Sequence, residues 1–348
     1  PGRGGYASAR AADRLVYEAR TRAAEFFGAH DPARVIFTPG GTYSLNMAIK
    51  GFLRAGDHII VCGRQHNAVV RPLETLDGAI GVSRFVWDGM GPVREKDVEP
   101  LLTPRTRAMI VNHASNVDGL LYPLEPLGVF CKKHRLALIV DVAQSAGLVA
   151  LDMKRHHISL LCATGHKGLW GLAGMGLLAL GGGVELDPLV EGGTGSFSDS
   201  GRMPDAYPDR LEPGSMNLAG IAALNAGLRE VGEAGIDAIF ARKMRLALIA
   251  YGGLKGIGGM RIYWPERPEH RIPVFSFAVE RMDCAEIGTR LDAEYGIACR
   301  AGLHCATQAH EEIGSYPQGT VRFAPGWFNQ EAEVELFLKA VAAIVAKR

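Results

Sequence analysis

The sequence lacks both the charge imbalance and the long apolar runs that would point to a nucleic acid or a membrane. Its 348 residues carry 38 Lys and Arg against 37 Asp and Glu, a formal net charge of +1, and no basic block stands out. Nucleic acid is therefore not an expected partner. The longest uncharged run, residues 168–184, contains Gly181-Gly182-Gly183, so we expect a loop and a strand there and no membrane span.

Cysteine pairs are also missing, although the chain has six cysteines. No CxxC motif occurs, so neither a zinc ribbon nor a thioredoxin-type redox site is indicated. Four of the cysteines lie inside apolar patterns and are expected to be inert core thiols. Unpaired thiols, together with the lack of a recognisable secretory signal, predict a protein of the reducing cytoplasm.

Short apolar runs alternate with segments of helical periodicity through the first two-thirds of the chain. This alternation predicts an α/β protein with a mostly parallel, mixed sheet flanked by helices. The expected strands are 34–38, 58–62, 108–113, 137–141, 160–164 and 175–180, and the expected helices are 9–27, 43–53, 68–76 and 124–134.

The pattern changes near Leu218, where a long helix at 218–233 leads into a smaller α+β region. We therefore predict a large domain over residues 1–230 and a small C-terminal domain over residues 231–348. The small domain is expected to contain strands at 272–279 and 320–324 and helices at 285–295 and 330–347.

The most informative pattern is an aspartate and a lysine that follow two successive predicted strands. Asp141 ends the apolar run 137–140, and Lys167 follows the run 160–163. Parallel strands deliver their ligand-binding residues to the same carboxyl edge, so we expect the two side chains to lie together. Such a pair suits pyridoxal 5'-phosphate (PLP), with Lys167 forming a Schiff base and Asp141 pairing with the pyridinium nitrogen.

A glycine-containing segment between a predicted strand and helix offers a place for the cofactor's phosphate. Thr38-Pro39-Gly40-Gly41-Thr42 lets the backbone approach a ligand closely, and the helix that follows presents free amides. A simple tight turn is the alternative for this segment taken alone. Beside Asp141 and Lys167, we predict that it is the phosphate cradle.

Several polar residues near predicted strand ends have both a functional and an ordinary interpretation. His66 could stack on the cofactor ring or be a surface-loop histidine. Asn116 could donate to the ring oxygen or only form a turn, and Gln144 is a second candidate donor. Thr164 and His166 could bind phosphate, while the alternative for His166 is a core histidine bonded to the backbone.

The segment Arg300-Ala301-Gly302-Leu303-His304-Cys305 is a second centre of interest. Its small residues indicate a flexible loop. A cysteine next to His304 and near Arg300 could have thiolate character, with an ordinary thiol as the alternative. Arg322, on the apolar run 320–324, needs an anionic partner, either a substrate carboxylate or a structural salt bridge.

Two glycine-bearing segments, 191–196 and 212–217, flank a polar stretch. The second segment precedes the helix expected at 218–233. Ser215 in this segment could cap the helix or contact a phosphate, and capping is the simpler interpretation.

Together these residues resemble the class V aminotransferase family, which has fold type I of the PLP enzymes. Within that family, the chain is most similar to the cysteine desulfurase and selenocysteine lyase branch. The resemblance covers nearly the whole chain, and the segment ending in His304-Cys305 is typical of the group II (SufS-like) desulfurases. The matching segments are Gly40-Gly41-Thr42, Gln65-His66-Asn67, Ser115-Asn116-Val117, Asp141–Gln144, Thr164–Lys167, Glu212–Ser215, Arg300–Cys305 and Val321-Arg322-Phe323.

The resemblance implies a role for each matching residue. Lys167 would bind PLP covalently, Asp141 would pair with the ring nitrogen, His66 would stack on the ring, and Gln144 would contact the ring oxygen. Cys305 would be the sulfur-accepting nucleophile, and no metal is implied. Phosphate ligands would be Gly41, Thr42, Thr164, His166 and, from a neighbouring subunit of a homodimer, Ser215. Substrate ligands would be Arg322, Asn116 and Arg300.

The chain departs from the family pattern in two places. Relatives usually have one or two dozen residues ahead of the Gly-Arg-Gly at 2–4, and that segment, which commonly helps to close the active site, is expected to be missing from this sequence. The loop also has Leu303 where many relatives have a second histidine. The resemblance therefore assigns no proton-transfer role to position 303.

We predict a PLP-dependent cysteine desulfurase that converts L-cysteine to L-alanine and leaves a persulfide on Cys305 for a sulfur-acceptor protein. A selenocysteine lyase, or another class V lyase, aminotransferase or epimerase that does not use Cys305, is the alternative, because a shared fold does not fix the reaction. A catalytically silent binding subunit is a further alternative. The presence of both Lys167 and Asp141 argues against it.

Overall fold

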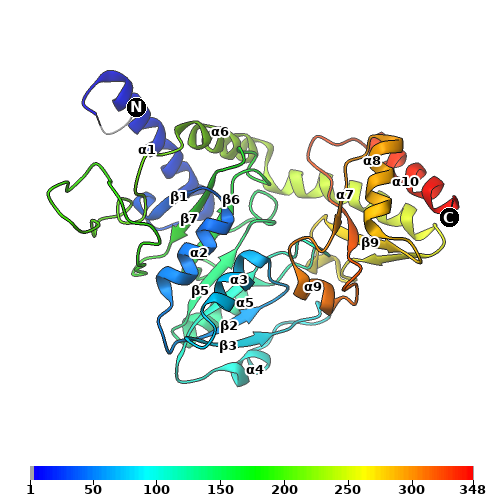
Figure 1. Cartoon of the computed structure of the whole chain (residues 1–348), viewed down its shortest axis with the longest axis horizontal. Coiled ribbons are helices and arrows are strands. Elements are labelled where there is room, and N and C mark those ends of the chain that lie inside the picture. Colours follow the sequence, from blue (N-terminus) through cyan, green and yellow to red (C-terminus); the bar gives the residue numbers. More distant parts are fainter. Residues whose placement is uncertain (1–3, 348) are drawn as a thin grey trace.

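The computed structural model describes residues 4–347, so part of the Gly-Arg-Gly segment at 2–4 lies outside the described residues. The chain forms two sheets, each with its own helices (Figure 1). The strands of the larger sheet are β1 (Val35–Thr38), β2 (His58–Cys62), β3 (Gly81–Phe85), β4 (Thr106–Asn112), β5 (Ala137–Asp141), β6 (Leu160–Thr164) and β7 (Gly176–Leu180).

The strand order in the larger sheet is β1-β7-β6-β5-β4-β2-β3. The run from β3 to β6 is parallel, whereas β7 pairs antiparallel with both β6 and β1. This arrangement confirms the prediction of a mostly parallel, mixed sheet. The register sets Asn112 beside Asp141 and Asp141 beside Cys162, so β4 and β5 end at one level while β6 continues to Thr164.

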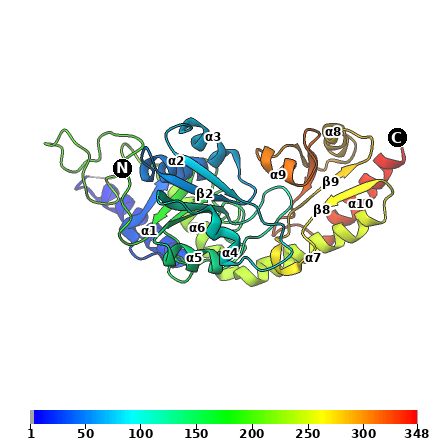
Figure 2. The same ribbon diagram turned by 90° about the horizontal axis from the view of Figure 1, so that it is seen from below.

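Helices cover both faces of the larger sheet (Figure 2). Ile59 and Val61 belong to the core under α2 (Gly41–Phe52) and α3 (Asn67–Thr75), whereas Ile60 belongs to the core under α1, α5 and α6. The bounds of these three helices are Ala7–Phe27, Leu124–Lys133 and Leu218–Ala234. Burial on both faces explains why the strands read as continuous apolar runs instead of alternating ones.

The smaller sheet is antiparallel in the order β10-β11-β9-β8. Its strands are β8 (Met260–Tyr263), β9 (Phe275–Val279), β10 (Arg300–Gly302) and β11 (Thr320–Phe323), and they share a core with α7 (Ile236–Lys255), α8 (Cys284–Tyr295) and α10 (Glu331–Ala346). Short helices α4 (Glu95–Val98) and α9 (Thr307–Glu312) complete the pattern. None of the described helices combines the length and apolarity needed to cross a membrane.

Helices α4, α7 and α9 and strands β3, β8 and β10 were not predicted from the sequence. The spacing of Ile239, Leu246, Ala250 and Leu254, which are buried, gives α7 a readable apolar stripe. Strand β3 lies at the sheet edge and is mostly exposed, so it has no apolar run to reveal it. Helix α6 packs on α1 and α7 packs on α10; the division of the chain at residue 230 stays a prediction.

Candidate active site

A cavity of about 750 Å³ opens at the carboxyl edge of the larger sheet. This volume lies within the range of small-molecule sites. The cavity brings together residues that are far apart in the sequence, from the start of α2, the loop before α3, the ends of β5 and β6, and strand β10. The predicted site residues in its wall are Gly41, Thr42, His66, Asn116, Asp141, Gln144, Thr164, His166, Lys167 and Arg300.

Asp141 is the acid at the floor of this cavity, and it is only 3% exposed. Its Oδ1 accepts a hydrogen bond from the amide of Ala143 at 2.9 Å, and Oδ2 has no hydrogen-bond partner among residues 4–347. Burial raises the pKa of Asp141, and the Ala143 amide, Lys167 and His66 oppose that effect. A cationic ligand atom at Oδ2 would therefore stabilise the carboxylate.

Lys167 lies in the same wall, and solvent reaches it from the cavity. Protein atoms nevertheless surround much of the side chain, and this desolvation is the main cause that lowers the pKa of Lys167. Asp141 raises this pKa, while Arg322 and Arg300 lower it further. The amine is thus more readily neutral than an ordinary lysine, as a nucleophile or base requires.

His66 caps α3, and its Nδ1 accepts a hydrogen bond from the amide of Ala68 at 3.0 Å. This bond fixes the ring orientation and leaves the proton of the neutral ring on Nε2. Burial lowers the pKa of His66, with an opposing contribution from Asp141. His66 is thus a half-buried residue of the loop before α3 that is fixed in the cavity wall, which favours a role at the cofactor ring.

The start of α2, which lines the same cavity, is rich in donors. Gly40 has φ 153°, a conformation that favours glycine, and it precedes the first turn of α2. The amides of Gly41 and Thr42, in that turn, have no intrahelical partner, so the helix start suits an anion. His166 is exposed with its Nδ1 3.1 Å from the Thr164 hydroxyl, so a core histidine bonded to the backbone is the wrong interpretation.

The side-chain amides of Asn116 and Gln144 differ in their burial and hydrogen bonds. Asn116 is buried, and its Nδ2 donates to the carbonyl oxygen of His304 at 2.7 Å. Its Oδ1 is buried without a partner in the described part of the chain. Gln144 is half-buried in the cavity wall. Asn116 therefore connects the cavity with the segment that carries Cys305.

The segment before Cys305 is not the loop that its small residues indicated, because Arg300–Gly302 form the edge strand β10. The chain then turns sharply, and His304 and Cys305 have φ of 50° and 59°. Non-glycine residues in this left-handed region cost about 1–2 kcal/mol each. Cys305 is half-buried, with the Arg300 Nη2 at 3.1 Å from its Sγ.

His304 does not face this thiol. Its Nε2 lies 3.1 Å from the carbonyl oxygen of Thr320, and its ring packs beside His310. Burial lowers the pKa of His304 to about 3, so the ring carries no charge at neutral pH. The expectation that His304 promotes a thiolate at Cys305 is therefore wrong, and Arg300 is the cation beside the sulfur.

Arg322 lies next to this site, paired with Arg300 across β11 and β10. Its Nη1 donates to the backbone oxygen of Asn116 at 3.0 Å. Burial and the charge of Arg300 lower the pKa of Arg322. Within residues 4–347, no carboxylate forms an ion pair with Arg322, so the structural salt bridge is not observed.

Ser215 is not in the cavity wall. It is exposed and lines a second cavity of about 210 Å³, together with Tyr43, Met175 and Met216. It does not cap α6, since the side chain of Asn217 accepts a hydrogen bond from the Gly220 amide at 3.0 Å. The simpler interpretation of Ser215, helix capping, is therefore wrong.

One residue of the cavity wall was not predicted, although the sequence pattern indicates it. Asn112 ends β4 and lies beside Asp141 in the register, so the rule that identified Asp141 applies to it as well.

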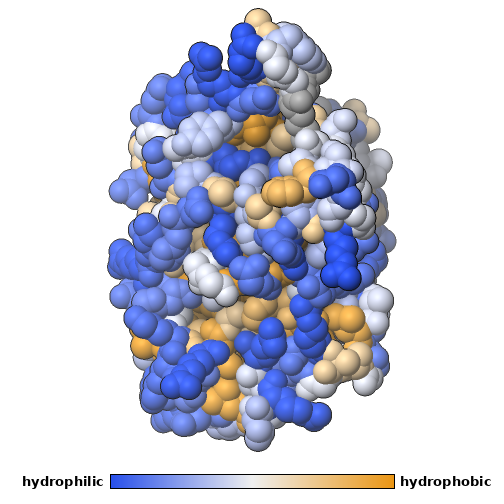
Figure 3. Space-filling model, turned by 90° about the vertical axis from the view of Figure 1, so that its left-hand side faces the viewer, coloured by the Kyte–Doolittle hydropathy of each residue, from blue (hydrophilic) through white to orange (hydrophobic). Residues whose placement is uncertain are grey.

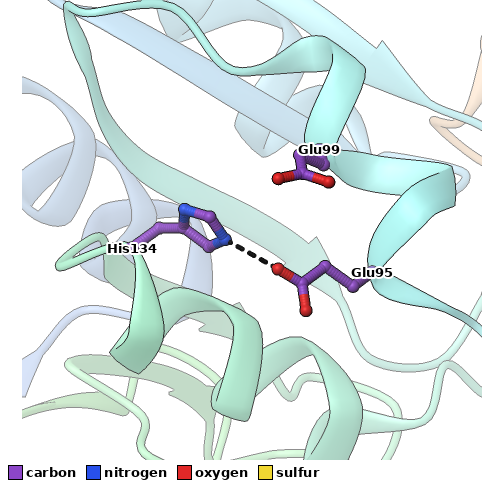
Figure 4. A group of neighbouring side chains, drawn as sticks. All are labelled: Glu95, Glu99 and His134. Atoms are coloured by element: carbon purple, nitrogen blue, oxygen red, sulfur yellow. Dashed lines mark hydrogen bonds and ion pairs between the residues drawn. The ribbon is translucent and has the colours of Figure 1, made fainter.

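Among the described residues, one exposed group has the spacing of metal ligands, namely Glu95, Glu99 and His134 (Figure 4). Lys133 already contacts Glu95 at 2.6 Å, and the group lies outside the cavity.

These side chains fit PLP. The unpartnered oxygen of buried Asp141 suits a protonated ring nitrogen, and the Lys167 amine suits the aldehyde. His66 offers a fixed ring face. The start of α2, with Thr164 and His166, offers amide, hydroxyl and imidazole donors to a phosphate.

Comparison with known proteins agrees with this site. A family model described as aminotransferase class-V matches residues 1–337. A probable cysteine desulfurase of Methanothermobacter thermautotrophicus is 28% identical over 342 residues, covering 96% of this chain and 85% of the relative. A cysteine desulfurase of Yersinia pseudotuberculosis serotype IB is 32% identical over 302 residues, covering 82% of this chain and 72% of the relative.

A solved structure shows the same fold. The apo structure of a cysteine desulfurase from Thermococcus onnurineus NA1 matches with a TM-score of 0.91 at 27% identity, covering 99% of this chain and 87% of that one. Fold type I of the PLP enzymes, which the motifs predicted, is confirmed. The chain belongs to the class V aminotransferase family.

Proposed function

We propose that the protein is a PLP-dependent cysteine desulfurase that forms L-alanine and a persulfide on Cys305. The observation that carries this proposal is the contact between Cys305 Sγ and Arg300, whose side chain also lines the cavity of Lys167 and Asp141. A thiol is thereby held at the edge of a PLP site. The relatives named cysteine desulfurases support the same reaction.

PLP is the family's cofactor, and when bound it withdraws electrons from the substrate Cα. Asp141 would pair with the ring nitrogen and keep it protonated, His66 would stack on the ring, and Gln144 and Asn116 would contact the ring oxygen. Lys167 would bind the aldehyde. Gly41, Thr42, Thr164 and His166 would bind the phosphate.

Arg322 binds the carboxylate of L-cysteine, and Asn116 and Arg300 complete the substrate site. The half-buried guanidinium of Arg322 has no carboxylate partner among residues 4–347, which leaves it available for this bond. The Lys167 amine would remove the Cα proton of the bound substrate and later return a proton. Its lowered pKa favours the neutral amine that this step needs.

The sulfur step uses Cys305 as a nucleophile. Its thiolate attacks the substrate sulfur, an S–S bond forms, and the Cβ–S bond breaks. The electron pair of the broken bond stays with Cβ, which takes up a proton and becomes the methyl group of alanine. The balance is L-cysteine plus the Cys305 thiol giving L-alanine plus the Cys305 persulfide.

We further propose a homodimer in which Ser215 reaches the phosphate of the neighbouring subunit. Ser215 lies outside the wall of its own chain's main cavity, and the exposed apolar residues Leu172, Val190 and Phe197 occur in the same part of the chain. The segment between β7 and α6, green in Figure 1, lies toward the face drawn in Figure 3, where apolar side chains stand among hydrophilic ones. A sulfur-acceptor protein and a cytoplasmic location stay predictions.

Mass spectrometry of the PLP-loaded protein after incubation with L-cysteine tests the function. We expect the peptide of Cys305 to gain the mass of one sulfur. The variant Cys305→Ala should lose alanine release by about 10²-fold or more, as expected for loss of a nucleophile. The matched control Cys299→Ala removes another half-buried thiol of the same region and should retain activity.

Alanine release that persists unchanged in Cys305→Ala would exclude the desulfurase mechanism. If only selenocysteine is turned over by that variant, a selenocysteine lyase is the better assignment. A purified protein that binds no PLP at all would instead indicate a silent binding subunit.

A further inference from the structure

The turn that carries Cys305, residues 303–306, rests on a loop from the larger domain. Val117 shares a buried apolar cluster with Ala306 and Ala309. One residue earlier, the side chain of Asn116 donates to the backbone of the turn at His304. The backbone amide of Asn67 adds a bond to the carbonyl oxygen of Cys305 at 2.8 Å. The turn is therefore held from outside, in a conformation that its own residues disfavour.

Arg64 joins the two sides of this contact. Its guanidinium forms an ion pair with Asp118, which follows Val117, and its Nε lies 3.2 Å from Oε2 of Glu312. Glu312 ends α9, the helix that begins directly after the turn. The three side chains are 11%, 5% and 17% exposed, so the network is largely shielded from water.

The charges in this network depend on Arg64. Glu312 has a second partner in Arg84, at 3.2 Å and 38% exposed. Arg64 is the one ion-pair partner of Asp118 within residues 4–347, and Asp118 Oδ1 has no hydrogen-bond partner there. Without Arg64, the buried carboxylate of Asp118 would lose its counterion while the carboxylate of Glu312 stays nearby. The two carboxylates would then separate.

We propose that Arg64 is a positioning residue for sulfur transfer. By neutralising Asp118 and Glu312 together, it fastens α9 to the loop of Asn116 and so holds the Cys305 thiol at the cavity. In the described part of the chain, Arg64 is not among the residues that line the cavity, so it acts through the turn. This inference rests on the proposed sulfur transfer.

The variant Arg64→Met in the full PLP-loaded chain tests this role. Loss of the network should free the turn but leave the cofactor site intact. We expect an unchanged cofactor absorbance, exchange of the substrate Cα proton within about twofold of the parent, and persulfide formation slower by about tenfold. Alkylation of Cys305 by iodoacetamide should become several-fold faster, measured by mass spectrometry against Cys299.

Glu312→Ala is a second variant that keeps the buried pair of Arg64 with Asp118 and is expected to fold if Arg64→Met does not. It should show the same two changes at Cys305. Arg84→Met, which breaks the more exposed contact of Glu312, is the matched control and should change neither rate by more than about twofold.

The results separate this inference from the function itself. A parent protein that forms no persulfide would overturn the proposed function. Persulfide and alkylation rates in Arg64→Met or Glu312→Ala that equal those of an active parent would overturn the positioning role. A parallel fall of Cα proton exchange and persulfide formation would also overturn it, because general damage to the site would then explain the loss.

Discussion

The edge of the larger sheet and the Cys305 turn are built in different ways. Asp141 and Thr164 stand at the ends of strands that are buried on both faces. Cys305 instead follows an edge strand of three residues and has a left-handed backbone conformation. The first region is fixed by its own core, whereas the second depends on Asn116, Asn67 and the network of Arg64.

This difference matches two chemical needs. Proton removal from Cα requires an amine, a carboxylate and a ring to keep one geometry, which rigid strands provide. Sulfur transfer requires the thiol to meet the substrate and then a second acceptor, so a turn held by a few polar contacts suits it. The following predictions test this division, beginning with the largest expected effect.

Lys167→Ala should abolish covalent capture of PLP, measured by borohydride reduction and peptide mapping. Alanine release should fall by at least about 10³-fold, since both the covalent anchor and the base are lost. Lys243→Ala is the control, because burial lowers the pKa of this half-buried amine to about 8 outside the cavity. If PLP instead binds covalently to Lys243, the reactivity of the amine, and not its position at the sheet edge, determines which lysine binds PLP.

Asp141→Asn should keep covalent PLP but lose the charge that holds the ring nitrogen protonated. We expect Cα proton exchange, followed by deuterium incorporation, to slow by about 10²-fold or more. The alkylation rate of Cys305 should stay within about twofold, because the turn has its own supports. Faster alkylation in this variant would contradict the independence of the two regions.

Acid should weaken the larger sheet through buried His113, whose amide donates to the carbonyl oxygen of Asp141 and whose Nδ1 lies 2.8 Å from the Ser145 hydroxyl. Burial lowers the pKa of His113 from 6.5 to about 3. Between these values the unfolded chain binds the extra proton and the folded chain does not, so stability falls as pH falls through this window.

Because of His113, the free energy of unfolding is expected to fall by about 2 kcal/mol between pH 6.5 and pH 4.5. Urea unfolding of the parent and of His113→Asn at both pH values measures it. The variant should show a smaller loss on acidification. An equal loss in both proteins would mean that His113 does not contribute.

The smallest effect is expected for Asn116→Ala at the point where the two regions meet. Loss of the bond to the His304 carbonyl, worth about 1 kcal/mol, should speed alkylation of Cys305 by about fivefold. Asn46→Ala is the matched control, since Asn46 lines the cavity and its Nδ2 bonds to the Thr42 carbonyl oxygen. Equal alkylation rates in both variants would remove Asn116 from the supports of the turn.

The sequence predicted the sheet edge well because its signals are local. Apolar runs end at Asp141 and Thr164, and glycines precede α2, so neighbouring residues reveal both the strands and the polar groups that they deliver. Asn112 obeys the same rule and could have been found. The stripe of α7 was also readable, whereas the exposed edge strand β3 was not.

The Cys305 turn was less predictable because its supports come from distant segments. The network of Arg64, Asp118 and Glu312 joins three regions that no local pattern connects. The orientation of His304 depends on Thr320, the first residue of β11, and adjacency to Cys305 in the chain was therefore misleading. The left-handed backbone conformation of His304 and Cys305 could not be predicted from the sequence, because no glycine stands at these positions.

The half-buried charge of Arg322 affects the free energy of the folded protein. A half-buried cation without an acidic neighbour in residues 4–347 raises the energy of the empty protein. If Arg322 binds the substrate as proposed, the carboxylate of an incoming amino acid would pair with this cation, and part of the affinity for substrate would be stored in the protein beforehand. Simple α-amino acids should therefore raise the melting temperature, and they should do so least when Arg322 is replaced by an uncharged residue.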